Sequence, residues 1–116
     1  MKEFIIYHNP RCSKSRQTLQ LLREAGIEPT IVEYLKRPLR KEELRNISQL
    51  LGLRPKDFVR KTEKDFKDNH LSERLDDDDK ILDAMSLFPK IIERPIVISG
   101  AEALIGRPPE NVQKLI

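Results

Sequence analysis

The first 35 residues alternate between strand-like and helix-like segments, and this order restricts the possible folds more than any other feature of the sequence. Residues 4–7, Phe-Ile-Ile-Tyr, form an aromatic and β-branched run that predicts a buried strand. Residues 13–25 carry apolar side chains near helical spacing, and Gly26 predicts the end of a helix. Residues 30–35, Thr-Ile-Val-Glu-Tyr-Leu, predict a second strand. Because a helix joins the two strands, we expect them to be parallel, as in a β-α-β unit.

The rest of the chain predicts a block of helices and then two further strands. The expected helices cover residues 41–51, about 55–60, from the acidic run 76–79 through Phe88, and a terminal segment ending at Leu115. The expected strands cover residues 95–98 and 103–105, and the turn signal Ser99-Gly100 between them predicts an antiparallel pair. We therefore expect one α/β domain over residues 1–116, with a helical insertion at approximately 40–90 between β-α-β and β-β-α halves.

The composition restricts the partners of this chain. Charged residues make up 35% of the sequence, and the net charge is only +3, from 22 basic and 19 acidic residues that are mostly interspersed. A nucleic-acid-binding domain normally has a dominant basic face, so we expect no nucleic-acid partner. The N-terminal apolar run is too short for a signal peptide, and no stretch approaches the ~20 apolar residues of a membrane span. We expect a cytoplasmic monomer without a membrane partner.

Cys12 is the only cysteine of the chain. A single cysteine excludes an internal disulfide, a two-cysteine redox motif and a multi-cysteine zinc site. With only two histidines, far apart in the sequence, we expect no metal site. A free thiol suits a reducing compartment, which agrees with a cytoplasmic location.

The sequence around Cys12 favours a reactive thiolate. Cys12 stands at the start of the helix predicted over 13–25, where unsatisfied backbone N–H groups and the helix dipole lower the pKa of a thiol. Arg11, Lys14 and Arg16 add positive charge. The same arrangement binds anions, and Ser15 is placed to donate a hydrogen bond to the thiolate. The alternative is an inert, buried cysteine.

Two other cysteine chemistries do not fit the spacing. A phosphatase loop needs a longer separation between cysteine and arginine than the three residues between Cys12 and Arg16. A thioredoxin-type dithiol motif needs a second cysteine where this chain has Ser15. A single nucleophilic thiol therefore remains as the reactive alternative.

The loop around Cys12 belongs to a longer pattern of residues. The pattern comprises His8-Asn9-Pro10, Cys12, Ser15-Arg16, Glu28-Pro29-Thr30-Ile31, Tyr34-Leu35, Arg60-Lys61, Arg94-Pro95-Ile96-Val97 and Arg107-Pro108. This ordered set resembles the glutaredoxin-linked arsenate reductase family, and the resemblance covers essentially the whole chain.

The resemblance implies a fold and a set of site residues. The implied fold is a thioredoxin/glutaredoxin-like, four-stranded mixed sheet with a helical insertion. The implied residues are the nucleophile Cys12; His8 and Ser15, which tune or hold the thiolate; the oxyanion-binding residues Arg60, Arg94 and Arg107; and two structural residues near the site, Asn9 and the cis-proline Pro95.

The resemblance also implies an activity. Arsenate would be reduced to arsenite, with glutathione as co-substrate, glutaredoxin as recycling partner and no tightly bound cofactor. An external thiol is needed because the chain has no second cysteine. One alternative is a glutathione-dependent thiol reductase with another substrate. A second is a non-enzymatic, Spx-like regulator that binds RNA polymerase, but Ser15 replaces one cysteine of the two-cysteine switch typical of such regulators.

Overall fold

A computed structural model describes residues 3–116, which divide into two compact units. Unit 1 combines the chain up to Arg37 with Arg94–Ile116, and unit 2 comprises Pro38–Glu93. The insertion expected at approximately 40–90 lies within unit 2. Cys12 and two of the three expected oxyanion-binding arginines lie in unit 1.

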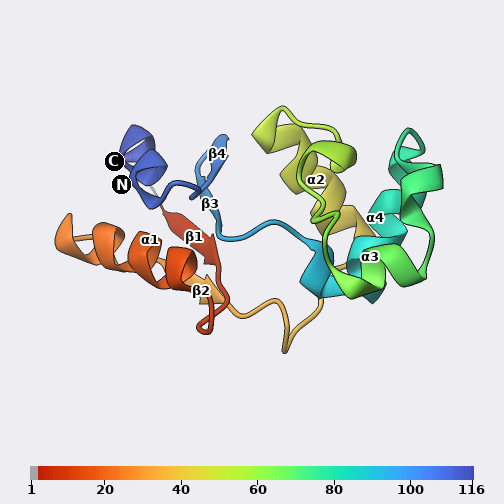
Figure 1. The fold of residues 1–116 in the computed structure, drawn as a ribbon. Coiled ribbons are helices and arrows are strands. Elements are labelled where there is room, and N and C mark those ends of the chain that lie inside the picture. The colour runs from red at the N-terminus through yellow and green to blue at the C-terminus, as the bar shows by residue number, and fades with distance from the viewer. Residues whose placement is uncertain (1–2) are drawn as a thin grey trace. The chain divides into compact units, whose positions relative to one another are not determined.

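Unit 1 contains one mixed sheet of four strands in the order β2-β1-β3-β4 (Figure 1). The strands are β1 (Phe4–Tyr7), β2 (Thr30–Val32), β3 (Ile96–Ser99) and β4 (Glu102–Ile105). β1 pairs in parallel with β2, whereas β3 pairs antiparallel with both β1 and β4. The predicted α/β class and the predicted strand directions are therefore confirmed. β2 ends three residues earlier than predicted, and the buried Tyr34 lies in the turn that follows it.

Two helical segments pack on one face of this sheet. They are α1 (Ser13–Glu24) and the terminal η4 (Pro109–Leu115), which is a 3-10 helix over its whole length (Figure 1). Their apolar side chains form a core with three strand residues, and its members are Phe4, Ile6, Leu19, Leu22, Val97, Val112 and Leu115. Burying each such side chain contributes about 1.5–3 kcal/mol. This packing fixes α1, and with it Cys12, on the sheet.

The two ends of α1 are formed differently. At its C-terminal end, Gly26 adopts a positive φ of 79° and its N–H bonds to the carbonyl of Arg23, as expected for a glycine stop. At its N-terminal end, Cys12 is the N-cap residue, and no acidic residue follows it in the first turn. No carboxylate therefore neutralises the positive end of this helix from its first turn.

Unit 2 contains three α-helices and three short 3-10 helices. Its elements are α2 (Lys41–Leu51), η1 (Pro55–Asp57), α3 (Lys64–Asp68), η2 (Leu71–Arg74), α4 (Asp78–Leu87) and η3 (Pro89–Ile91). The acidic run begins α4 as predicted, because the side chain of Asp77 accepts the N–H of Lys80. Lys41 and Arg45 both pair with Asp79. α3 was not predicted, because five residues are too few to show a helical period.

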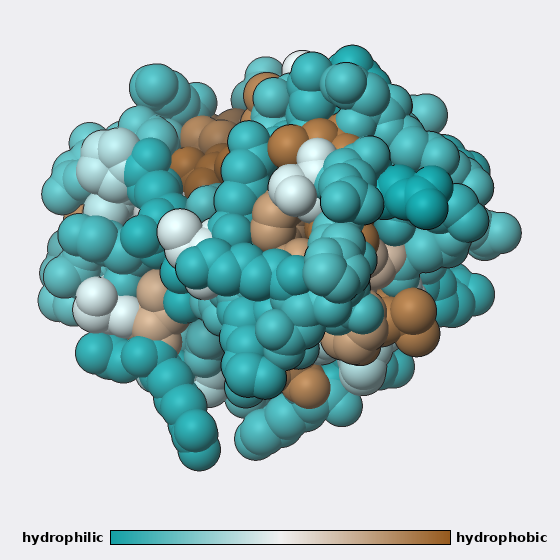
Figure 2. Space-filling view, turned by 45° about the vertical axis from the view of Figure 1, so that its right-hand side comes forward, coloured by the Kyte–Doolittle hydropathy of each residue, from teal (hydrophilic) through white to brown (hydrophobic). Residues whose placement is uncertain are grey.

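The surface agrees with the charged composition. Most of the face in the space-filling view is hydrophilic, with small separate hydrophobic areas (Figure 2). Within residues 3–116, no helix has both the length and the apolar character needed to cross a membrane. In the same range, no cluster of three or more histidine, cysteine or acidic side chains could hold a metal ion.

Candidate active site

The loop between β1 and α1 is held mainly by Asn9. The Asn9 carbonyl accepts the N–H of Cys12 at 3.0 Å, and its side-chain oxygen accepts the N–H of Arg11 at 3.0 Å. Arg16 donates from Nη1 to the carbonyl of Pro10 at 2.9 Å, which ties the loop to the first turn of the helix. These bonds place the sulfur of Cys12 at the N-terminal end of α1.

The environment of Cys12 favours the thiolate form. Partial burial raises the pKa of the Cys12 thiol, but the hydrogen bonds that the sulfur accepts outweigh this effect. The donors are the backbone N–H of Ser15, the guanidinium of Arg94, which also attracts the thiolate by its charge, and the backbone N–H of Lys14. The pKa of Cys12 therefore lies below its ordinary value. A lowered pKa in a partly exposed position is typical of a nucleophilic cysteine.

Two arginines converge on this sulfur from the C-terminal half of unit 1. Arg94 precedes β3 and hydrogen-bonds to Cys12, and Arg107 follows β4 with its Nη1 3.9 Å from Cys12 Sγ. The same Nη1 lies 3.4 Å from the carbonyl of Arg94, so the two arginine segments are adjacent. Each arginine is joined to the next proline by a cis peptide bond, as predicted for Pro95 and not predicted for Pro108. The residue pattern alone does not predict that these arginines approach Cys12, because they are far from it in the sequence.

His8, which follows β1, and Ser15, in the first turn of α1, form a buried pair. The two side chains are joined by a 2.5 Å hydrogen bond between Nδ1 and Oγ, and Ser15 Oγ also accepts the N–H of Asn9 at 3.1 Å. The hydroxyl of Ser15 is thus bound to His8, and it is the backbone N–H of Ser15 that bonds to Cys12. The sequence-based expectation that the hydroxyl contacts the thiolate is corrected in this respect.

Burial is the largest influence on the pKa of His8 and lowers it. The charge of Glu33 raises this pKa, and the charges of Arg23 and Arg16 lower it further. His8 is therefore neutral near neutral pH. The Nδ1 of a neutral His8 can accept a hydrogen bond from the Ser15 hydroxyl, while Ser15 Oγ accepts the N–H of Asn9. In this arrangement the pair holds Asn9 and the first turn of α1 in place.

A lowered pKa of His8 makes the stability of the fold depend on pH. The unfolded chain binds a proton near the ordinary histidine pKa of about 6.5, before the folded chain does. We therefore expect the free energy of unfolding to fall as pH decreases below that value, toward the lower pKa of the folded state. Urea unfolding between pH 7.5 and about 5.5 should show this slope in the wild type, and His8→Asn should reduce it.

The exposed His70 provides the matched control for this experiment. His70→Asn should retain the part of the slope that depends on His8. An undiminished slope in His8→Asn would show that His8 does not carry the pH dependence.

Arg60 has a different environment from Arg94 and Arg107. It belongs to unit 2, where its guanidinium pairs with Glu63 at 3.2 Å and with Glu93 at 3.4 Å. Two carboxylates thus already lie against this arginine. Oxyanion binding by Arg60 stays a prediction from the resemblance.

Comparison with known proteins places the chain in a family. The ArsC family model matches residues 7–115. The arsenate reductase of Haemophilus influenzae is 44% identical over 116 residues, with 97% of each chain covered. The uncharacterized protein YfgD of Escherichia coli K12 is 42% identical over 116 residues, which cover 99% of this chain and 98% of that protein. The solved structure of the arsenate reductase from Vibrio cholerae has a TM-score of 0.95 and 42% identity, covering 99% of this chain and 98% of its own.

The chain belongs to the ArsC family, and its sheet and helices form the thioredoxin-like fold of the arsenate reductase structures. The family predicted from the residue pattern is confirmed.

Proposed function

We propose that this protein reduces arsenate to arsenite, with Cys12 as the nucleophile and glutathione as the second thiol. The observation that supports this most is the convergence of Arg94 and Arg107 on a lone thiol of lowered pKa. Arsenate is an oxyanion that carries negative charge near neutral pH, and arginine presents planar donors that match such oxygens. Relatives at 40–44% identity are named arsenate reductases.

In the first step, the Cys12 thiolate attacks the arsenic(V) atom of arsenate. A sulfur–arsenic bond forms, and one arsenate oxygen takes up protons and leaves as water. No electron has yet been transferred to arsenic. Arg94 and Arg107 stabilise the charge on the remaining oxygens, and the N–H groups of Lys14 and Ser15 orient the sulfur before it attacks.

In the second step, glutathione supplies the thiol that this chain lacks. A glutathione thiol condenses with the arsenic and expels a second water, so that arsenic(V) links Cys12 to glutathione. A second thiol, from glutathione or glutaredoxin, then attacks the glutathione sulfur. A disulfide forms between this thiol and glutathione, and the bond between the glutathione sulfur and arsenic breaks. The electron pair of that bond stays on arsenic, which becomes arsenic(III) and remains bound to Cys12. Water then displaces arsenite from Cys12.

His8 and Ser15 act on the geometry of this site. Ser15 Oγ bridges His8 and the N–H of Asn9, and this fixes the turn in which the Ser15 N–H points at the sulfur. In this proposal the pair holds the thiolate in position and exchanges no proton with arsenate.

The function is tested by measuring arsenite formation directly, with arsenate, glutathione, glutaredoxin, glutathione reductase and NADPH present. We expect arsenite to form with the full mixture, to stop when glutathione is omitted, and to slow when glutaredoxin is omitted. Arsenite formation that continues without any added thiol would contradict the role of glutathione. No arsenite formation, combined with rapid alkylation of Cys12 near neutral pH, would favour a glutathione-dependent thiol reductase with another substrate.

A further inference from the structure

Gly106 lies in a very close contact that allows no side chain. A Cβ atom built on Gly106 would lie 2.6 Å from Thr18 Oγ1, 2.9 Å from Pro95 Cγ and 3.1 Å from Thr18 Cγ2. Gly106 does not have the positive φ of the other three glycines, so its backbone conformation is open to other residues. It is the packing at this position that requires glycine.

Hydrogen bonds link the same three residues. The N–H of Gly106 donates to the carbonyl of Pro95 at 2.9 Å, which joins the segment after β4 to the segment before β3. The hydroxyl of Thr18, a fully buried residue, lies 2.8 Å from the Lys14 carbonyl and 3.4 Å from the Gly106 carbonyl. Because a hydroxyl has one proton, the shorter bond to Lys14 dominates. Thr18 therefore meets Gly106 mainly by packing.

Each of these three residues is connected in the chain to one component of the thiolate site. Pro95 directly follows Arg94, Gly106 directly precedes Arg107, and Thr18 lies on α1, whose N-cap residue is Cys12. We propose that the Thr18–Gly106–Pro95 junction sets the distance of the two arginines from the Cys12 sulfur. In this proposal Thr18 and Gly106 are positioning residues for the thiolate.

The geometry at the sulfur makes this distance important. Arg107 Nη1 already lies 3.9 Å from Cys12 Sγ, so a small outward shift would remove the contact. Charged hydrogen bonds lose strength steeply with distance and angle. A displacement of about 1 Å in a catalytic group can lower a rate by about a hundredfold. Separating the two arginine segments from α1 should therefore weaken both thiolate stabilisation and oxyanion binding.

The test compares the wild type with Thr18→Ala, Gly106→Ala and the double variant. The first readout is the pH midpoint of iodoacetamide alkylation, which reports Cys12 alone because the chain has no other cysteine. The second readout is the KM for arsenate. Circular dichroism and urea unfolding report the fold and its stability separately. The alkylation readout needs no arsenate reduction, so failure of the proposed function would leave this test intact.

We expect Thr18→Ala, which only removes atoms, to fold and to raise the alkylation midpoint slightly, because it loosens the junction. Gly106→Ala should raise the midpoint further and increase the KM for arsenate roughly tenfold, because the new methyl group forces the segments apart. In the double variant, the overlap with Thr18 is removed and the 2.9 Å approach to Pro95 Cγ stays, so both values should return part of the way toward those of Thr18→Ala.

Three results would overturn the inference. The first is a folded Thr18→Ala protein with the wild-type midpoint and KM. The second is a double variant that remains as impaired as Gly106→Ala. A loss of stability in Gly106→Ala without change in either site readout would also show that the junction serves the fold alone.

Discussion

Cys12→Ser is expected to lower arsenite formation by roughly a thousandfold or more, to the rate of the mixture without enzyme. A serine hydroxyl is not ionised near neutral pH, so the N–H groups of Lys14 and Ser15 and the guanidinium of Arg94 would have no anion to stabilise. No other thiol of the chain could replace Cys12, because there is none. The measurement is the rate of arsenite formation in the complete glutathione and glutaredoxin mixture.

The substitution exchanges one atom in a partly exposed side chain, so the fold should remain intact. Urea unfolding provides the control, and Cys12→Ser should unfold near the wild-type midpoint. Arsenite formation at a substantial fraction of the wild-type rate would show that Cys12 is not the nucleophile.

Arg94→Ala is expected to have the second largest effect. Arg94 hydrogen-bonds to Cys12 and lowers its pKa by charge, and we propose that it also binds the oxyanion. Its removal should raise the pKa of Cys12 and reduce kcat/KM for arsenate about a hundredfold. The pH dependence of kcat/KM should shift in parallel, with the rise in activity moved to higher pH, because the reactive thiolate forms only above its pKa.

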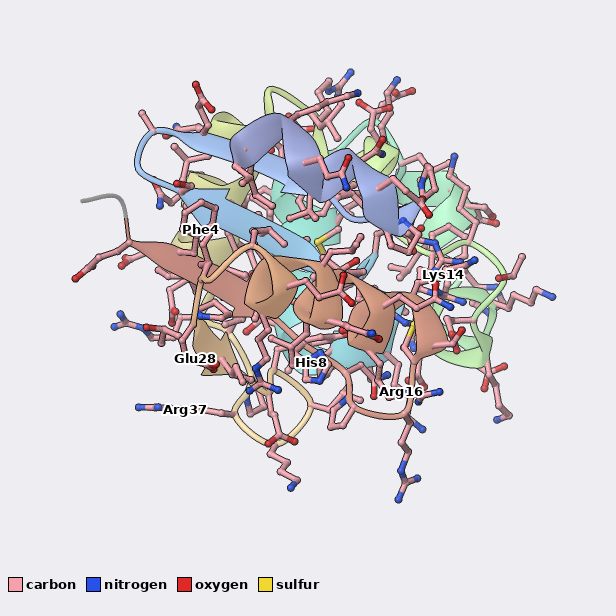
Figure 3. The ribbon with its side chains drawn as sticks, turned by 90° about the vertical axis from the view of Figure 1, so that its left-hand side faces the viewer. Phe4, His8, Lys14, Arg16, Glu28 and Arg37 are labelled. Atoms are coloured by element: carbon pink, nitrogen blue, oxygen red, sulfur yellow. The ribbon has the colours of Figure 1, made fainter. Side chains whose placement is uncertain are left out.

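Arg37→Ala is the matched control for Arg94→Ala. Arg37 is an exposed arginine of unit 1 (Figure 3), and its removal changes the net charge by the same amount. It should leave both kcat/KM and the pH dependence at wild-type values. If Arg94→Ala lowered kcat/KM without moving the pH dependence, Arg94 would bind substrate without tuning the thiol.

Local patterns were sufficient to predict most of the fold. The β-α-β order of the first 35 residues predicted the parallel pair β1 and β2, and Gly26 predicted the end of α1. The turn signal at Ser99-Gly100 predicted the antiparallel pair β3 and β4. These features depend on residues that are near one another in the sequence, so periodicity and turn preferences describe them well. β2 ended early because Tyr34 is buried in a turn, which a β-propensity pattern does not distinguish from a strand.

The site was predicted less completely, because it depends on long-range packing. The position of Cys12 at the start of a helix predicted its lowered pKa, but the approach of Arg94 and Arg107 depends on sheet topology. The sequence also could not show that the Ser15 hydroxyl pairs with His8. Gly106 resembles an ordinary turn glycine in the sequence, and only its contacts with Thr18 reveal a packing role.

We propose that unit 1 itself holds Cys12 as a thiolate at an anion-binding site. The most direct measurement is the rate of Cys12 alkylation by iodoacetamide as a function of pH, with and without arsenate. We predict a midpoint below the ordinary thiol pKa of about 8.5 and slower alkylation in the presence of arsenate. A midpoint at or above that value, with no protection by arsenate, would contradict it.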